Sequence, residues 1–132
     1  MQKFRFKTEN IDFMPIKKTK YSAGYDVFCN EDVRMRKGYC YLVGTGLYIE
    51  DAPSDFYLEL HPRSSLRFRA GVESVGIIDN DYRCEIKFIF YPKKDYILKV
   101  GDRIGQLIPK KMYDIMDCLE SDNERFGGFG ST

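Results

Sequence analysis

The sequence predicts a single all-β domain that carries one short helix. Short apolar and aromatic runs of strand length recur along the chain between turn-forming residues. Aromatic residues, which favour strands, make up 15% of the 132 residues. No long stretch repeats its apolar residues with the 3.6-residue period of a helix. Together these observations favour a β-sandwich or a β-barrel.

The first half of the chain contains three segments with a strand pattern. Phe4 and Phe6 alternate with basic residues near the start. Residues 39–43 precede a Gly-Thr-Gly turn, and residues 56–60 alternate before Pro62. We therefore expect a strand at each of these places.

The second half repeats the strand pattern after one short helix. The helix expected over residues 64–69 begins with a hydroxyl residue and carries Leu66 and Phe68. Two groups of turn-forming residues, 79–81 and 92–94, are natural hairpin connections. The strands expected around them span residues 72–78, 84–91, 96–100 and 104–108.

The length and the composition of the C-terminus predict one domain with an arm. A chain of 132 residues is long enough for one core and too short for two. From Ser121 onward the sequence is polar and glycine-rich, so it cannot pack a core by itself. We predict a folded domain over residues 1–120 and a flexible arm over residues 121–132.

The charge balance argues against polymer binding. Lys and Arg total 21 and Asp and Glu total 20, and the formal net charge of +1 provides no basic field for a nucleic-acid backbone. We therefore expect no nucleic-acid partner. A small charged ligand can still be held by a local cluster, because net charge does not say where the charges lie.

Cysteine usage and hydropathy indicate a soluble intracellular protein. The four cysteines form no C-x-x-C pair and His61 is the single histidine, which makes a structural zinc site improbable. Free cysteines are typical of a reducing compartment. No run approaches the roughly 18 apolar residues of a membrane span, and residues 1–13 lack the apolar stretch of a signal peptide. We expect a cytoplasmic location, or the nucleus or host-cell interior if the source is viral, and no membrane contact.

The most informative segment for function is residues 76–83. An apolar strand runs directly into an acidic turn and then an aromatic residue, which places Asp79 at a strand end with Tyr82 beside it. Such an arrangement fits a small-molecule pocket. An ordinary hairpin turn with surface acids has the same pattern.

Two further segments suit phosphate groups. Arg63, Ser64 and Ser65 bring a guanidinium fork and two hydroxyls to a helix start. Residues 125–132 combine an arginine, glycines, an aromatic and hydroxyls on the arm. A helix cap with an exposed arginine and a disordered tail are the alternatives.

Two polar residues near the ends of the domain complete the set. Asp26 can hold a magnesium ion through its water shell, because Mg²⁺ keeps several waters and takes one or two carboxylates with substrate phosphates. Gln106 can donate to a phosphate oxygen. A turn aspartate and an Asp-Arg ion pair are the alternatives.

These five segments, in this order, resemble the five motifs of the trimeric dUTPase family across nearly the whole chain. The resemblance implies a jelly-roll-like β-barrel, a homotrimer with active sites at subunit interfaces, and Mg²⁺-dependent hydrolysis of dUTP to dUMP and pyrophosphate. That reaction limits uracil in DNA and supplies dUMP for dTMP synthesis. A dUTP-binding regulator with weak turnover, acting on an unknown partner protein, and a dCTP deaminase-like relative are the alternatives.

The resemblance also implies a role for individual residues. Asp79 matches the catalytic carboxylate that activates the attacking water, and Tyr82 the ring that excludes a 2′-hydroxyl. Uracil is read by backbone groups of a hairpin, here around Glu73, Gly76, Ile77 and Ile78, with the returning strand near Lys87.

The remaining matches concern the phosphates and the arm. Arg63, Ser64 and Ser65 match the motif that holds the phosphate chain, assisted by Gln106, and Asp26 the residue that holds hydrated Mg²⁺. In the arm, Arg125 matches the γ-phosphate ligand, Phe129 the aromatic that covers uracil, and Gly130 and Ser131 donors to phosphate oxygens.

The chain also departs from the family pattern. Ser65 and Cys84 stand where glycine is usual, and Gly105 stands where alanine is usual, which we expect to cost a little stiffness in a strand. One residue separates Arg125 from its Gly-Gly pair instead of two, so the arm is one residue shorter.

Overall fold

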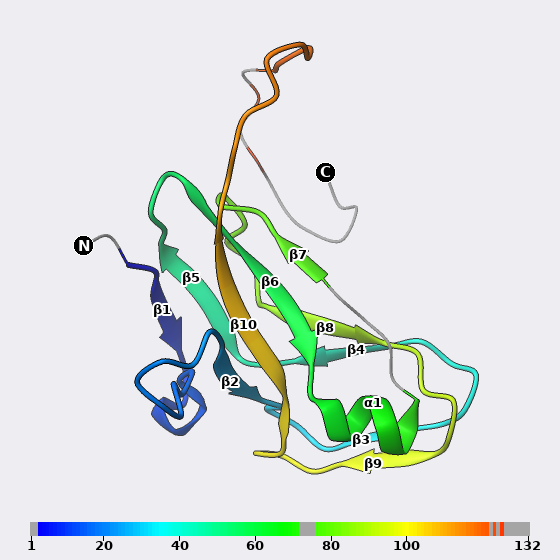
Figure 1. Ribbon diagram of the computed structural model, residues 1–132. Coiled ribbons are helices and arrows are strands. Elements are labelled where there is room, and N and C mark those ends of the chain that lie inside the picture. The colour runs from blue at the N-terminus through cyan, green and yellow to red at the C-terminus, as the bar shows by residue number, and fades with distance from the viewer. Residues whose placement is uncertain (1–2, 72–75, 122, 124, 126–132) are drawn as a thin grey trace.

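The computed structural model describes residues 3–71, 76–121, 123 and 125. The described residues form ten strands, one α-helix and one 3-10 helix, which confirms the predicted all-β class (Figure 1). In chain order the elements are β1 (Arg5–Thr8), the 3-10 helix (Ile11–Phe13), β2 (Tyr25–Phe28), β3 (Val33–Met35), β4 (Tyr41–Gly44), β5 (Leu47–Asp51), β6 (Phe56–Pro62), α1 (Ser64–Ala70), β7 (Gly76–Ile78), β8 (Lys87–Phe90), β9 (Tyr96–Leu98) and β10 (Arg103–Lys111).

The strands pair antiparallel in one larger sheet and three pairs. The larger sheet has the order β2-β10-β6-β7, and the pairs are β1 with β5, β3 with β9, and β4 with β8. Most partners lie far apart in the sequence, as in the jelly-roll arrangement implied by the family resemblance. Figure 1 shows the larger sheet in front of β4, β5 and β8, with the core between them.

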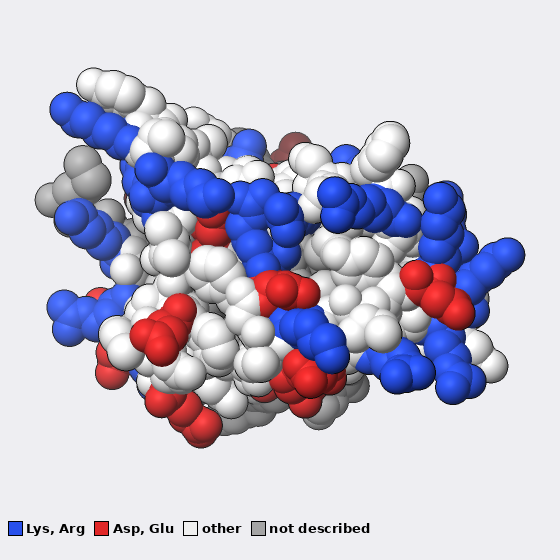
Figure 2. All heavy atoms as spheres, turned by 90° about the horizontal axis from the view of Figure 1, so that it is seen from below, with Lys and Arg blue, Asp and Glu red and all other residues white. Residues whose placement is uncertain are grey.

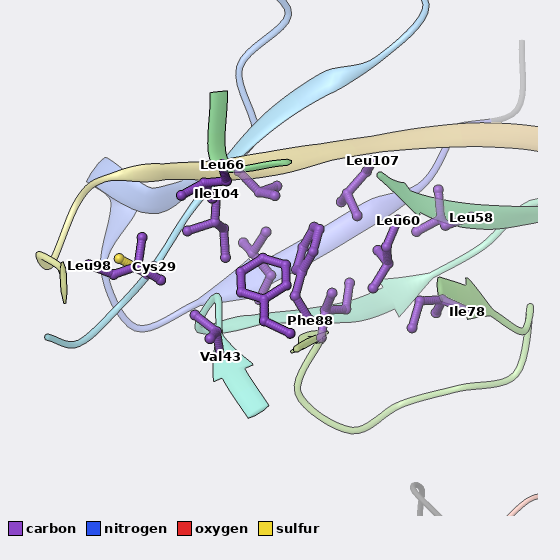
Figure 3. Close-up of a cluster of buried hydrophobic side chains, with 14 of the residues drawn as sticks. Cys29, Val43, Leu58, Leu60, Leu66, Ile78, Phe88, Leu98, Ile104 and Leu107 are labelled. Atoms are coloured by element: carbon purple, nitrogen blue, oxygen red, sulfur yellow. The ribbon is translucent and has the colours of Figure 1, made fainter. Parts of the chain in front are cut away.

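The core is built by alternation along the strands. Leu58 and Leu60 of β6 point inward and are 2% and 3% exposed, whereas the residues between them lie on the outer face of the sheet. Phe88 and Phe90 of β8 belong to the same buried cluster, with their ring centroids 5.6 Å apart. Figure 3 shows Phe88 on the side of the core opposite the larger sheet. Burial of these large apolar side chains is the main stabilising contribution to the fold.

Gly105 lies where the core has no room for a side chain. A Cβ atom at this position would be 2.3 Å from the carbonyl oxygen of His61 and 2.6 Å from the ring of Phe88. Besides the small loss of stiffness expected here, the position therefore has a steric requirement. The glycine is required because β10 packs directly against the Phe88 ring.

The predicted helix is confirmed as α1 and extends one residue further, to Ala70. α1 ends at Gly71, which adopts the left-handed conformation with φ of 62° and donates its N–H to the carbonyl of Leu66. Leu66 and Ala70 share the buried face, since they are one helical turn apart. Phe68 lies on the opposite face and is 88% exposed.

The two predicted hairpins are not formed among the described residues. The turn at residues 79–81 connects β7 to β8, but β7 pairs with β6 and β8 pairs with β4. The turn at residues 92–94 likewise joins strands of two different pairs. Residues 79–81 and 92–94 do connect strands as predicted, but each adjoining strand pairs with a strand elsewhere in the chain.

The chain leaves the folded body after β10. Residues 112–121 form no helix or strand and extend away from the sheet (Figure 1). Apolar side chains on this segment are solvent-exposed, including Tyr113, Ile115, Met116 and Leu119 at 73–103%. The described residues contain no helix long and apolar enough to cross a membrane.

Candidate active site

The acidic turn after β7 is rigidly anchored. The N–H of Tyr82 donates to the carbonyl of Asp79 at 3.1 Å and closes the turn. The side-chain amide of Asn80 donates to the carbonyls of Pro53 and Phe56 at 2.6 and 2.8 Å, which ties the turn to the start of β6. The Asp79 side chain is left 60% exposed at the strand end.

Asn80 is an anchoring residue of this turn that the sequence patterns did not single out. Its position between two acids in the turn was the available signal, because Asn in turns commonly bonds to backbone groups. Arg83 supports the same turn by donating to the carbonyls of Asn80 and Tyr82 at 2.6 and 3.1 Å.

Tyr82 forms a fixed wall beside Asp79. Its ring is 3% exposed, and its hydroxyl donates to the carbonyl of Glu85 at 2.7 Å. Burial raises the pKa of Tyr82 to about 12, so the phenol stays neutral at ordinary pH. The hydrogen bond and the burial together determine where the ring lies.

Arg125 joins the arm to this turn. Its Nη1 atom lies 2.7 Å from Oδ2 of Asp79 and 3.8 Å from Oδ1 of Asp81. The guanidinium carbon stacks 5.3 Å from the centroid of the Tyr82 ring. Within one chain, therefore, Arg125 is held by the turn, where the family resemblance implies a contact with the γ-phosphate.

β7 is the edge strand of the larger sheet among the described residues. Gly76 and Ile78 lie opposite Leu60 and Leu58 of β6, so one row of β7 backbone groups faces away from the ladder. Ile77 is 57% exposed. Lys87 of β8 pairs with Gly44 of β4, and among the described residues it has no pairing with β7.

The predicted phosphate segment lies at the opposite end of β6. The N–H of Arg63 donates to the carbonyl of Ile104 at 2.9 Å, which attaches this segment to β10. The Nε atom of Arg63 is buried and has no hydrogen-bond partner among the described residues. Ser64 and Ser65 follow it as the first residues of α1, exposed and half-buried respectively.

Asp26 and Gln106 lie on the same side of the sheet as this segment. They face each other across β2 and β10, and Gln106 is opposite His61 of β6. The Gln106 side chain packs so closely on Gly24 that a Cβ there would be 1.9 Å from its Oε1 atom. A side chain at residue 24 would therefore require Gln106 to adopt another rotamer.

Asp26 lies beside two cations. Arg103 Nη1 and Lys18 Nζ are 3.3 and 3.8 Å from its Oδ2 atom, and the Asp26 side chain is 13% exposed. Its Oδ1 atom has no ion pair or hydrogen bond with another described residue. Asp26 thus uses one carboxylate oxygen in these ion pairs and keeps the other for another ligand.

The predicted site residues form two separate groups within one chain. Asp79, Tyr82 and Arg125 lie near the start of β6, because Ile78 pairs with Leu58. The second group lies at the C-terminal end of β6 and just after it, and consists of Asp26, Gln106, Arg63, Ser64 and Ser65. Five residues of extended chain separate Leu58 from Arg63, which is roughly 16 Å at about 3.3 Å per residue. Glu73, Phe129, Gly130 and Ser131 lie outside the described residues.

Comparison with known proteins agrees with the motif order. The family model described as dUTPase matches residues 12–132. A deoxyuridine 5′-triphosphate nucleotidohydrolase of Paramecium bursaria Chlorella virus 1 is 41% identical over 125 residues, which cover 89% of this chain and 88% of the relative. The enzyme of the same name from Saccharomyces cerevisiae is 32% identical over 131 residues, covering 90% of this chain and 86% of the relative.

Solved structures show the same fold. A dUTPase of Staphylococcus bacteriophage 80alpha with dUpNHpp matches with a TM-score of 0.76 and 19% identity, covering 98% of this chain and 95% of that chain. A dUTPase of S. aureus phage phi11, described with a structural Mg(II) ion, matches with a TM-score of 0.77 and 17% identity, covering 92% and 99%. The jelly-roll-like fold is confirmed.

Proposed function

The chain belongs to the dUTPase family, and we propose that it hydrolyses dUTP to dUMP and pyrophosphate by attack of an Asp79-activated water on the α-phosphorus. The observation that carries the mechanism is the Asp79 turn. An exposed carboxylate stands at a strand end, on a backbone anchored by Asn80 and closed by Tyr82. The dCTP deaminase alternative has no support among the relatives described above.

Asp79 would act as the general base. Its 60% exposed side chain is accessible to water, and a base must lie within about 3 Å of the water that it deprotonates. The Arg125 contact at 2.7 Å occupies one carboxylate oxygen. We infer that the triphosphate draws Arg125 from Asp79 to the γ-phosphate, because a polyphosphate offers the guanidinium more charge and bidentate geometry.

Tyr82 would select deoxyribose. A ring fixed by burial and by its bond to the Glu85 carbonyl cannot move aside for a 2′-hydroxyl. Discrimination by exclusion requires such a rigid wall. Uracil would be read by the free backbone edge of β7 at Gly76, Ile77 and Ile78, where hydrogen bonding depends little on side-chain identity.

The phosphate chain would bind at the Arg63 segment. A buried donor without a partner costs about 1–3 kcal/mol, so the Nε atom of Arg63 favours an anionic oxygen from outside the described chain. The hydroxyls of Ser64 and Ser65 and the amide of Gln106 would add further donors. Their shared role is to neutralise and orient the triphosphate.

A magnesium ion fits this segment as an ion that arrives with the substrate. Among the described residues no group of three or more His, Cys, Asp or Glu side chains could hold a resident metal. Mg²⁺ commonly takes a single carboxylate together with waters and substrate phosphates. The unengaged Oδ1 atom of Asp26 would hold its water shell, and the ion would neutralise phosphate charge.

The separation of the two residue groups supports a homotrimer with shared sites. A base near the start of β6 and a phosphate segment roughly 16 Å further along cannot act on one α-phosphate within one chain. A second copy can bring its own Asp79 turn to the Arg63 segment. The exposed apolar side chains of residues 112–119 could be buried between the subunits of such an assembly.

The direct test is pyrophosphate release from a panel of dUTP, dCTP, dTTP and UTP, with and without Mg²⁺. We expect rapid release from dUTP alone, dependent on the metal. Tight dUTP binding without turnover would support the regulatory alternative and contradict this proposal. Ammonia release from dCTP would support the deaminase alternative. If the proposal holds, the enzyme limits uracil in DNA and supplies dUMP for dTMP synthesis.

A further inference from the structure

Seven exposed Lys and Arg side chains form a continuous surface at the α1 end of the molecule. The end of α1 is joined to the turn after β8, because the N–H of Lys93 donates to the carbonyl of Ala70 at 2.8 Å. A Cβ at Gly71 would lie 2.7 Å from the Cβ of Lys93, so the helix end and the turn after β8 touch. We call this surface the basic ridge; it consists of Arg34, Arg36, Lys37, Arg67, Arg69, Lys93 and Lys94.

The other half of the basic ridge lies across the same turn. The N–H of Gly38 donates to the carbonyl of Pro92 at 3.2 Å, and β3 pairs with β9 alongside. Figure 1 shows α1, β3 and β9 at one end of the molecule. Seen from that end, Lys and Arg side chains form a band across the upper part of Figure 2. Elements distant in sequence thus combine their charges on one surface.

The basic ridge contains four arginines and three lysines. Its four arginines form no ion pair with any residue that the structure describes. Asp95 lines one surface hollow with Arg34 and Arg36, where its carboxylate offsets part of their charge, and it accepts a hydrogen bond from the backbone N–H of Lys37 at 2.9 Å. The whole chain has a net charge of +1. The cations on this surface therefore reflect where the fold places the charges and not an overall excess of positive charge. Such a surface attracts an extended anion.

Aromatic side chains are interleaved with these cations. Phe68 stands between Arg67 and Arg69 and is 88% exposed, on the helix face away from the core. Tyr39 and Tyr91, on either side of the Gly38–Pro92 contact, are 65% and 58% exposed. A phenyl ring in water contributes nothing to the core, but it can stack on an unpaired base while neighbouring arginines contact phosphates.

We propose that the basic ridge binds single-stranded nucleic acid. The near-neutral net charge of the chain predicts no nucleic-acid partner, but the fold brings Lys and Arg residues that are far apart in the sequence onto one surface. An acidic peptide would use the cations and leave the exposed rings without a role. A duplex keeps its bases stacked on each other and would leave Phe68 without a partner. The basic ridge uses none of the residues assigned to nucleotide hydrolysis, so the two proposals stand separately.

The test is binding of a fluorescein-labelled oligothymidylate of about 20 nucleotides to the full chain, followed by anisotropy across a salt series. We expect binding that weakens with salt. Arg67→Gln/Arg69→Gln should lower the affinity at least about tenfold and reduce the salt slope by about 1.4, since each phosphate contact contributes about 0.7. The control Arg5→Gln/Lys7→Gln makes the same charge change on β1 and should leave the affinity unchanged.

Two further measurements define the ligand and the site. Phe68→Ala, which alters no charge, should weaken oligothymidylate binding about fivefold and leave duplex binding unchanged. Excess dUTP should not displace the oligonucleotide, and dUTP hydrolysis should be normal in every ridge variant. The proposal is overturned by absence of binding, by an equal loss in the β1 control, by insensitivity to Phe68→Ala, or by displacement with dUTP.

Discussion

The Asp79 turn and the Arg63 segment lie at the two ends of β6, and different forces hold them. The turn is held by side chains that bond to backbone groups, chiefly Asn80 and Tyr82. The Arg63 segment is held by the sheet ladder and by close packing at Gly105. The turn can therefore lose its geometry through one polar substitution, whereas the segment changes only when β10 itself moves.

The largest expected effect is loss of the base. Asp79→Asn should lower kcat about 10²- to 10⁴-fold with little change in dUTP binding, because it removes the proton acceptor and keeps the shape of the turn. Pyrophosphate release and equilibrium dUTP binding measure the two effects. Asp81→Asn is the matched control, since Asp81 is equally exposed and also near Arg125, and it should keep activity within a few-fold. Equal losses in both variants would refute the base assignment.

The next prediction tests whether the Asp79 turn of one chain and the Arg63 segment of another chain form one active site. Asp79→Asn and Arg63→Ala are each expected to be inactive, but a co-refolded mixture should recover activity. In mixed trimers about a quarter of the sites combine an intact turn with an intact Arg63 segment, if each site takes one from each chain. Recovery is measured by pyrophosphate release, with each variant refolded alone as the control. A mixture as inactive as its components would place the whole site within one chain.

Gly105→Ala tests the packing that holds the Arg63 segment. The added Cβ would overlap the His61 carbonyl and the Phe88 ring, so we expect a loss of about 3 kcal/mol in the free energy of unfolding. Denaturant melts measure it. Adding Phe88→Leu should restore part of the loss caused by the substitution, because it removes one of the two contacts. If Gly105→Ala alone were as stable as the wild type, β10 would be able to shift and accommodate the added Cβ.

Asn80→Ala tests the anchoring of the turn. Two backbone carbonyls would lose their donor, and we expect a loss of about 2 kcal/mol in stability. Because the turn carries the base, kcat should fall more than dUTP affinity. Asn80→Asp serves as the comparison, since it has the same shape and cannot donate. Unchanged kcat in both variants would mean that the turn does not depend on this anchor.

Tyr82→Phe should have the smallest effect. It removes only the hydrogen bond to the Glu85 carbonyl, which contributes about 1 kcal/mol to stability. The loosened ring should also reduce the preference for dUTP over UTP, measured as the ratio of their kcat/KM values. A fully retained preference would show that packing alone fixes the ring.

The sequence alone determined the fold class and the chemistry of the local motifs. Alternation, turn residues and aromatic content are read within a few residues, so the all-β class, the short helix and the acidic turn at Asp79 were predictable. Motif order likewise indicated the family. Asn80 also lies inside a segment that the sequence singled out, although its anchoring role depends on the position of the β5–β6 connection.

Only the tertiary structure decided which strands pair and where the motifs meet. Pairing of β7 with β6 and of β8 with β4 depends on burial between distant segments, which no local pattern encodes. The same non-local packing placed Phe88 against Gly105, brought Arg125 to Asp79, and gathered the cations of the basic ridge. It also set the Asp79 turn and the Arg63 segment at opposite ends of β6.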